Sequence, residues 1–129
     1  MCSSDLPKFE LVKEADEDSK DWELKLDNAK GKRAKLNDAC NHYKVDPSAP
    51  KLEEFRKSRD DYGSAYGLLR EKTIFLKKKL AETKKALEVL KDKTACKPDV
   101  KKGEDTVKAE FDGEVQASSS ICQGVTAQR

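Results

Sequence analysis

The sequence predicts an all-α fold: a long antiparallel two-helix hairpin with a coiled-coil-like seam, followed by a flexible C-terminal tail. Three observations support it: the composition, an apolar repeat with a period of 3.5 residues, and a breaker segment between two such repeats. Charged residues make up 40% of the 129 residues, hydrophobic residues 36% and aromatic residues 6%. That balance suits long helices that each bury one narrow stripe, and it leaves little interior for a pocket.

The strongest signal lies in residues 51–96, where we predict the second helix of the hairpin. Its stripe positions alternate in steps of three and four, which is the coiled-coil pattern. They are Leu52, Phe55, Arg59, Tyr62, Tyr66, Leu69, Thr73, Leu76, Leu80, Thr83, Leu87 and Leu90. Because proline is excluded from a helix interior, this helix is expected to end before Pro98.

The first helix of the hairpin is predicted over residues 19–43, which repeat the pattern more weakly. Residues 1–18 form an acidic segment that we expect to be partly helical. Residues 44–50 carry two prolines and form the predicted loop. A short connection between two long helices favours an antiparallel hairpin, here residues 19–96.

The charges of the two helices agree with this arrangement. If the turn is centred near Pro47, Trp22 is expected beside Thr73, and the acidic end of the first helix faces lysines of the second. The acidic residues are Glu14, Asp16, Glu17, Asp18 and Asp21, and the lysines are Lys72, Lys77, Lys78 and Lys79. Each exposed pair contributes only about 0–1 kcal/mol, but together the pairs select the register.

The lysine-rich half of the second helix is a candidate basic patch for nucleic acid or an anionic membrane. Its members are Lys77, Lys78, Lys79, Lys84, Lys85 and Lys91. The alternative, which we favour, is a solvated face compensated within the molecule, since no aromatic residues are interleaved to stack on bases. An electrostatic binder is therefore the second functional hypothesis, and it predicts a steep loss of affinity with salt.

Polar residues interrupt the seam halfway along the predicted hairpin, where Gly31 and Gly63 lie at about the same height. One interpretation is structural: small residues allow close backbone approach, and polar seam residues specify the register. The other is a notch where a third helix docks, because tyrosine and arginine are frequent binding hot spots. The anchors of that notch would be Arg33, Arg59, Tyr62 and Tyr66.

Leu68, Phe75 and Val89 lie beside the seam and widen the apolar stripe of the second helix. Two helices cannot easily cover so wide a stripe, so we expect a third helix, a second copy or a partner to complete the bundle. The leading hypothesis is a protein–protein interaction or scaffold module that presents these residues and the notch to another protein. A structural spacer, which would not need the extra stripe, is the third hypothesis.

Residues 97–129 are rich in small and polar residues and are predicted to form a polar, flexible tail. Val107, Ala109 and Phe111 alternate up to Asp112-Gly113, which is also typical of a β-hairpin. A lone two-stranded ribbon is marginal in water, so the ribbon is the less favoured alternative.

No glycine-rich phosphate loop, Ser/His/Asp set or metal-ligand cluster occurs in the sequence, and His42 is its single histidine. We therefore predict that the protein is not an enzyme and takes neither a cofactor nor a small-molecule substrate. We expect no targeting segment and no membrane-spanning helix. The four scattered cysteines favour unpaired thiols in a cytoplasmic protein, with a disulfide framework as the alternative. They are Cys2, Cys40, Cys96 and Cys122.

Overall fold

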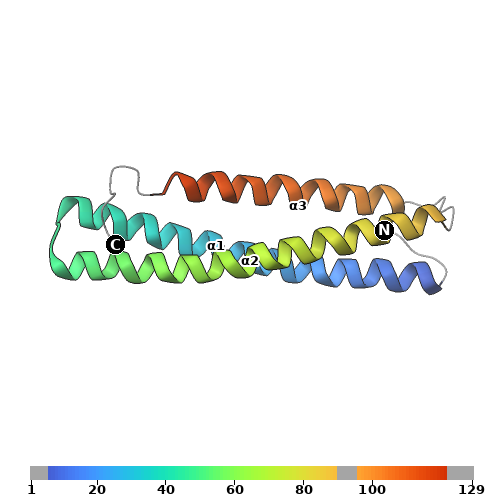
Figure 1. Cartoon of the computed structure of the whole chain (residues 1–129), viewed down its shortest axis with the longest axis horizontal. Coiled ribbons are helices and arrows are strands. Elements are labelled where there is room, and N and C mark those ends of the chain that lie inside the picture. Colours follow the sequence, from blue (N-terminus) through green and yellow to red (C-terminus); the bar gives the residue numbers. More distant parts are fainter. Residues whose placement is uncertain (1–5, 90–95, 122–129) are drawn as a thin grey trace.

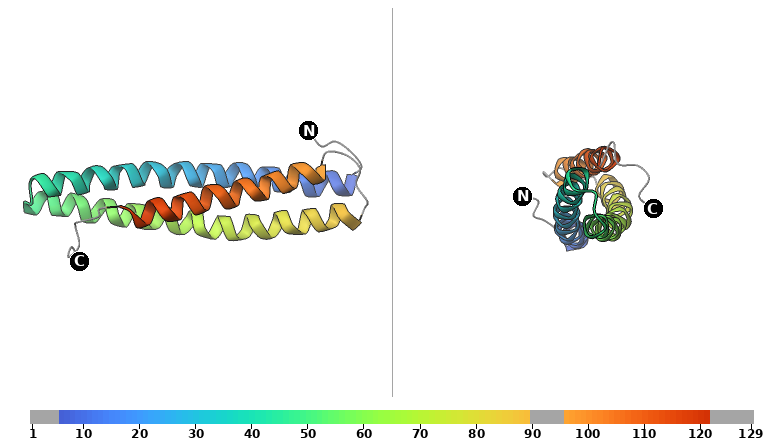
Figure 2. Two further views of the ribbon diagram at one scale, coloured as in Figure 1. Left: turned by 90° about the horizontal axis from the view of Figure 1, so that it is seen from above. Right: turned by 90° about the vertical axis from the view of Figure 1, so that its left-hand side faces the viewer.

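A computed structural model of the chain describes residues 6–89 and 96–121. Within these ranges the chain forms three helices and no strand, which confirms the all-helical prediction. The helices are α1 (Leu6–Val45), α2 (Ala49–Val89) and α3 (Cys96–Ser119). Figure 1 shows α1 and α2 running antiparallel, with α3 lying along them and parallel to α1. The end-on view in Figure 2 shows the three helices arranged around one long axis.

The turn between α1 and α2 occupies only residues 46–48, so it is shorter than the loop predicted for residues 44–50. The Asp46 N–H donates to the His42 carbonyl at 2.9 Å and closes the last turn of α1. Pro50 lies in the first turn of α2, where a missing N–H leaves no helical hydrogen bond unmade. Both helices can therefore run almost to the turn.

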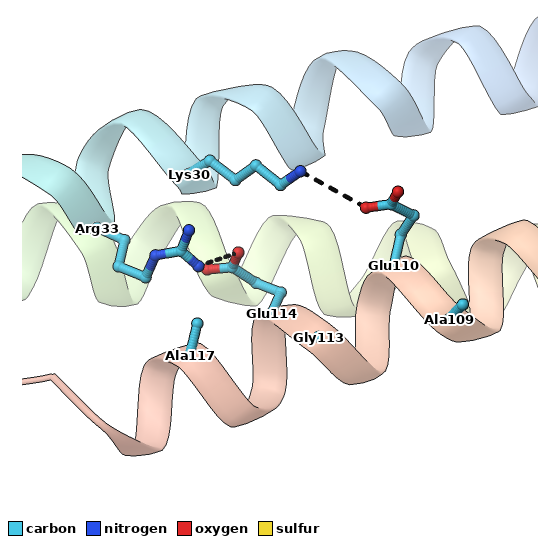
Figure 3. A pocket seen from close by; sticks show the side chains of 7 residues that line it. All are labelled: Lys30, Arg33, Ala109, Glu110, Gly113, Glu114 and Ala117. Carbon is cyan, nitrogen blue, oxygen red and sulfur yellow. Dashed lines mark hydrogen bonds and ion pairs between the residues drawn. The ribbon is translucent and has the colours of Figure 1, made fainter.

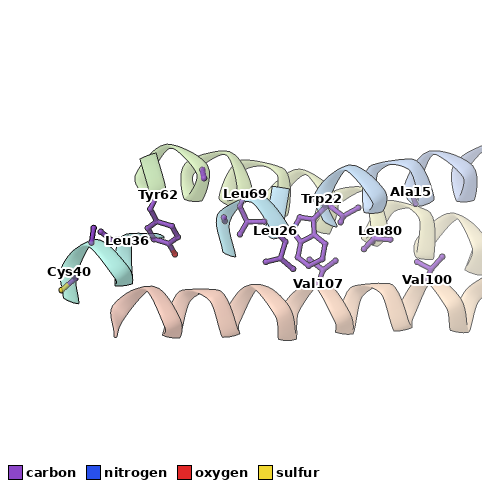
Figure 4. Close-up of a cluster of buried hydrophobic side chains, with 14 of the residues drawn as sticks. Ala15, Trp22, Leu26, Leu36, Cys40, Tyr62, Leu69, Leu80, Val100 and Val107 are labelled. Atoms are coloured by element: carbon purple, nitrogen blue, oxygen red, sulfur yellow. The ribbon is translucent and has the colours of Figure 1, made fainter. Parts of the chain in front are cut away.

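The seam between α1 and α2 is apolar and continuous (Figure 4). The buried residues of α2 coincide with the predicted stripe: Phe55, Tyr62, Ala65, Leu69, Thr73, Leu76, Leu80, Thr83 and Leu87. From α1, Trp22 Nε1 donates to Thr73 Oγ1 at 2.7 Å, in the register that the sequence predicts. Thr73 Oγ1 in turn donates to the Leu69 carbonyl at 2.7 Å, so the Trp22 indole N–H and the Thr73 hydroxyl both have partners.

Ion pairs flank this seam near the start of α1. Lys72 Nζ lies 3.2 Å from carboxylate oxygens of both Asp18 and Asp21, and Lys79 Nζ lies 2.8 Å from Glu14 Oε1. The hydrogen bond from Lys72 holds the pKa of Asp21 below its ordinary value. These pairs join the acidic and basic stretches that the charge pattern predicted to be neighbours.

Residues 96–119 form α3, which corrects the prediction of a flexible tail over residues 97–129 for the part up to residue 119. Residues 122–129, the end of the predicted tail, lie outside the described residues. The second helix is expected to end before Pro98, and the described part of α2 ends at Val89; Pro98 itself lies near the start of α3. The first turn of a helix tolerates proline and favours an acidic residue, here Asp99. Gly113, part of the predicted β-hairpin turn, is inside α3. Residues 90–95, predicted as helix, lie outside the described residues.

One face of α3 packs on the hairpin, and its central residues are seven positions apart. Val100, Val107 and Glu114 are buried, while Phe111 and Ile121 pack at the edge of the core. Seven residues are close to two helical turns, so such positions share one face. This face is poorer in large apolar side chains than the seam between α1 and α2.

Two further predictions concern the membrane and the cysteines. Across residues 6–89 and 96–121, no helix carries an apolar stretch that could cross a bilayer. Cys40 is disulfide-bonded, which corrects the expectation of an unpaired thiol at this position. The side chains of the other three cysteines lie outside the described part of the chain.

Candidate functional site

Each helix places one polar side chain at the same point of the bundle: Arg33 from α1, Tyr62 from α2 and Glu114 from α3. Arg33 Nη1 donates to Glu114 Oε1 at 2.6 Å, and the Tyr62 hydroxyl donates to Glu114 Oε2 at 2.7 Å. Glu114 is only 2% exposed. We call these three residues the polar cluster. Both oxygens of one buried carboxylate are thus bound, each from a different helix.

The surroundings of the polar cluster keep the Tyr62 hydroxyl protonated. Burial and the hydrogen bond to Glu114 raise the pKa of Tyr62 above its ordinary value. The hydroxyl therefore remains a donor, and the Arg33 guanidinium is always charged. A buried carboxylate without such partners would be strongly destabilising. The cluster consequently defines where α3 can sit on the hairpin.

Aromatic side chains extend this contact between α2 and α3. The Tyr66 ring stacks on the Phe111 ring of α3 with centroids 6.0 Å apart, and it also lies 5.8 Å from the Tyr62 ring. Three of the four predicted notch anchors, Arg33, Tyr62 and Tyr66, therefore contact a third helix that belongs to the same chain. The fourth, Arg59, lies over the Phe55 ring at 5.8 Å.

The glycines of this region do not act as predicted. Gly31 and Gly63 are exposed, and a Cβ added at either position would meet nothing within 4 Å. The expectation that they let the two backbones approach closely is therefore wrong. The contact at this height depends on the polar cluster and on the aromatic pair.

A shallow hollow of about 290 Å³ opens between α1 and α3 beside the polar cluster (Figure 3). Its lining residues are Lys30, Arg33, Ala109, Glu110, Gly113, Glu114 and Ala117. The charges in it are paired: Lys30 Nζ lies 3.5 Å from Glu110 Oε2, and Arg33 binds Glu114. A charged ligand would have to break these pairs, and the volume is at the lower limit for ligand pockets. The hollow therefore gives little support to a small-molecule site.

The remaining predicted interface residues, Leu68, Phe75 and Val89, stay exposed after α3 has docked. Their exposed fractions are 50%, 49% and 74%. Their seven- and fourteen-residue spacings keep them close to one line along α2, which we call the outer stripe. The Phe75 ring lies under Lys72 Nζ at 4.8 Å and Lys79 Nζ at 6.0 Å. These lysines reach to α1, so the outer stripe borders α1 on the side away from α3.

The structure divides the predicted basic patch. Three of its lysines contact a ring or a carboxylate of the same chain: Lys77, Lys79 and Lys84. Lys78 and Lys85 are exposed on α2, whereas Lys91 lies outside the described residues. Part of the patch is therefore compensated internally, and Lys78 and Lys85 remain candidates for contact with an anionic partner.

Sequence reasoning missed Glu114 and Phe111 because both were assigned to a flexible tail. The available signal was the seven-residue spacing of Val100, Val107, Glu114 and Ile121. Within residues 6–89 and 96–121, no three His, Cys, Asp or Glu side chains are grouped as metal ligands. Comparisons of the chain with models of protein families, with curated proteins and with solved structures found no match.

Proposed function

We propose that the protein is a non-enzymatic interaction module that presents the outer stripe to a helix of another protein. The carrying observation is the exposure of Leu68, Phe75 and Val89 in a molecule whose seams are otherwise filled. The sequence suggested that a third helix, a second copy or a partner would cover these residues; α3 supplies a third helix, but it packs on the opposite flank of α2 and leaves them exposed. Aligned apolar side chains left in solvent typically mark protein-binding surfaces.

The spacing and charge of this surface indicate the chemistry of the partner. Apolar anchors repeating along one helix face are typical of recognition between helices. Lys78 and Lys85 are exposed on α2 beside the outer stripe. The partner that fits best is therefore an amphipathic helix with an apolar ridge and acidic residues along one border. Such charge complementarity mainly affects the association rate and the specificity.

Two features of the polar regions support an interaction module over a catalyst. Arg33, Tyr62 and Glu114 are bound to one another across three helices, so they act as structural contacts. The hollow beside them is shallow, and its charged groups are paired, whereas catalysis benefits from a site that excludes water. We therefore propose no reaction, cofactor or small-molecule substrate.

The test is a triple variant, Leu68→Ala/Phe75→Ala/Val89→Ala, compared with the wild-type chain in partner capture and in titration against the captured protein. We expect affinity to fall at least about tenfold, because truncating a central apolar anchor commonly costs 1 kcal/mol or more. Circular dichroism and the melting temperature should change little, because these side chains are half exposed or more. Unchanged affinity of the triple variant would refute the proposal.

A matched control removes apolar side chains that point elsewhere. Leu24 on α1 and Ile74 on α2 are 68% and 59% exposed, and neither belongs to the outer stripe. Leu24→Ala/Ile74→Ala should therefore bind the partner with wild-type affinity. Equal losses in both variants would indicate nonspecific adhesion of exposed apolar residues.

The same experiment separates the remaining hypotheses. An electrostatic binder would capture nucleic acid or anionic vesicles, lose them steeply with salt and respond to Lys78→Gln/Lys85→Gln. A structural spacer would show no binding that depends on the outer stripe. If the partner is a second copy, sedimentation will show a dimer that the triple variant converts to a monomer.

A further inference from the structure

We infer that the groove of the hairpin beneath α3 is a recognition site for an acidic helix of another protein, and that α3 is its built-in competitor. Such a helix would displace α3 and repeat the contacts that α3 makes. Three observations support the inference: the direction of the ion pairs, the composition of the groove and the weakness of α3 as a helix. The groove lies on the flank of α2 opposite the outer stripe, so the inference does not depend on the proposed function.

Ion pairs between the hairpin and α3 run in the same direction. In three of them a hairpin cation meets a carboxylate of α3: Lys30 with Glu110, Arg33 with Glu114 and Lys84 with Glu104. Their N–O distances are 3.5, 2.6 and 3.1 Å. Figure 3 shows the first two pairs between α1 and α3. The sequence of α3 has six acidic and four basic residues, a net charge of −2. The groove therefore favours a negatively charged helix.

Aromatic and cationic side chains of the hairpin form the groove beside these pairs. The Tyr66 ring stacks on the Phe111 ring at a centroid distance of 6.0 Å, and Lys77 Nζ lies 5.9 Å from the centroid of the same Phe111 ring. The Tyr62 hydroxyl donates to Glu114 Oε2 at 2.7 Å. Tyrosine and arginine are enriched at binding hot spots. Departure of α3 would therefore expose a surface with the composition of a protein-binding site.

The contacts of α3 define the pattern that a partner helix needs. Val107 is buried, Phe111 follows four positions later and packs at the edge of the core, and Glu114 follows three positions after that. Residues at positions i, i+4 and i+7 lie on one face of a helix. The partner that fits is an acidic helix with a β-branched apolar residue, a phenylalanine and a glutamate at this spacing.

The hold of α3 on the hairpin is weak for a helix of 24 residues. Its central contact buries a carboxylate, and the desolvation of that group offsets much of what its partners contribute. Gly103 and Gly113 lower its helix propensity, although packing requires neither. An added Cβ at Gly103 would lie 3.8 Å from a Leu80 carbon, and one at Gly113 would meet nothing within 4 Å. A helix of the same pattern that lacks the two glycines can therefore compete with α3.

Competition by a peptide tests the inference on the full chain. The probe is a fluorescently labelled synthetic peptide of residues 97–121, which carries the contact pattern of α3 and contains no cysteine. We expect the wild-type chain to bind it weakly, because its own α3 occupies the groove. Glu114→Ala loosens α3 and should bind the peptide at least about tenfold tighter, since apparent affinity rises with the population of the open groove.

Strengthening α3 should have the opposite effect. Gly103→Ala/Gly113→Ala raises helix propensity at two positions that accommodate a Cβ, so it should bind the peptide on the order of tenfold more weakly than the wild-type chain. Hydrogen exchange measures the displacement itself. Adding the peptide to wild-type protein should reduce the protection of α3 in the chain and leave α1 and α2 protected.

Matched controls place the peptide in the groove. A peptide with Glu114→Ala should bind the Glu114→Ala chain at least about tenfold more weakly than the natural peptide does. The natural peptide should show a similar loss with the chain Arg33→Ala/Glu114→Ala, but not with Lys78→Gln/Glu114→Ala, where the changed lysine is exposed outside the groove. A loss caused by the Lys78 change would indicate nonspecific attraction to lysines and would overturn the inference.

A second variant guards against misfolding of the first. Phe111→Ala removes the stacking on Tyr66, so it should also bind the peptide more tightly than the wild-type chain, with circular dichroism showing that the hairpin remains helical. The inference is wrong if α3 loses hydrogen-exchange protection in either variant and the peptide binds no tighter. A wild-type dimer that the peptide dissociates would replace the foreign helix with α3 of a second copy.

Discussion

The two interfaces of the bundle are built from different chemistry. Between α1 and α2, fully buried leucines such as Leu69 and Leu76 alternate with polar groups that are satisfied locally. Against this hairpin α3 contributes two valines, Val100 and Val107, and then the carboxylate of Glu114. The first interface buries more apolar bulk per turn, whereas the second has a hydrogen-bonded ion pair at its centre.

This difference indicates a division of tasks. Apolar burial is non-directional, so the leucine seam stabilises the hairpin but tolerates small shifts. The polar cluster is directional, because Glu114 finds donors from Arg33 and Tyr62 at one position of α3 only. Buried polar contacts of this type can specify register at a cost in stability. We therefore expect variants of the hairpin seam to lower stability most, and variants of the polar cluster to affect mainly the placement of α3.

The largest effect is expected for Leu76→Ala in the hairpin seam. Leu76 is fully buried, so its truncation should lower the free energy of unfolding by about 3 kcal/mol through lost burial and a cavity. Denaturant unfolding followed by circular dichroism measures this loss. The control Leu68→Ala, at a half-exposed position, should change it by less than about 1 kcal/mol. Equal losses would contradict a stability concentrated in the seam.

Glu114→Ala should have the next largest effect. Arg33 and Tyr62 would lose their shared acceptor, so the free energy of unfolding should fall by about 2 kcal/mol. Hydrogen exchange should show α3 losing protection before α1 and α2. Glu114→Leu also leaves Arg33 and Tyr62 without their acceptor, but it keeps more of the packing volume and should therefore be less destabilising than Glu114→Ala. Unchanged exchange in α3 for Glu114→Ala would show that the valines alone place this helix.

The same difference explains what the sequence could predict. The register of Trp22 with Thr73 was predictable because the apolar period and the charge pattern both constrain it. The helix α3 was not predictable in this way, because Glu114 and Gly103 interrupt the apolar residues on its inward face. Gly103 packs near Leu80, where an added Cβ would lie 3.8 Å from a side-chain carbon. The notch residues of the hairpin could be identified from the sequence. Glu114, which binds them, could not, because nothing distinguishes it from the other acidic residues in a chain that has 25 of them.

Tyr62→Phe should lower the free energy of unfolding by a smaller amount, and this amount should depend on pH. The pKa of Tyr62 is raised in the folded state, so its contribution is fully present below the ordinary tyrosine pKa near 10. It is lost as pH rises above that value, because the unfolded chain releases a proton that the folded chain retains. Tyr62→Phe should cost about 1 kcal/mol at pH 8 and should weaken the alkaline loss of stability. Denaturant unfolding at pH 8 to 11 measures both changes.

Tyr43→Phe is the matched control, since Tyr43 stacks on Phe55 near the turn, at a centroid distance of 6.4 Å. This variant should keep the alkaline loss because Tyr62 is still present. A wild-type pH profile for Tyr62→Phe would show that the buried hydroxyl does not couple protonation to folding.

The smallest effect on stability is expected for Lys72→Gln, which removes the ion pairs to Asp18 and Asp21 at the edge of the seam. Lys72 and Asp18 are partly buried, but the pairs lie at the edge of the seam within reach of solvent, so we expect them to stabilise weakly and to be partly screened by salt. The sharper readout is the carboxylate itself: the pKa of Asp21 is lowered mainly by the hydrogen bond from Lys72. Asp21 therefore contributes to the free energy of unfolding at pH values above the ordinary aspartate pKa. This contribution is lost as pH falls through the lower pKa of the folded state.

In Lys72→Gln, NMR titration should show the pKa of Asp21 rising toward its ordinary value of 3.8. Lys78→Gln, a change on the exposed face of α2, should leave the pKa of Asp21 at its lowered value. If neither variant moves this pKa, the pairing of acidic and basic stretches does not orient α1 against α2. If only Lys72→Gln moves it while stability hardly changes, these charges act as the polar cluster does: they select a register that apolar burial then stabilises.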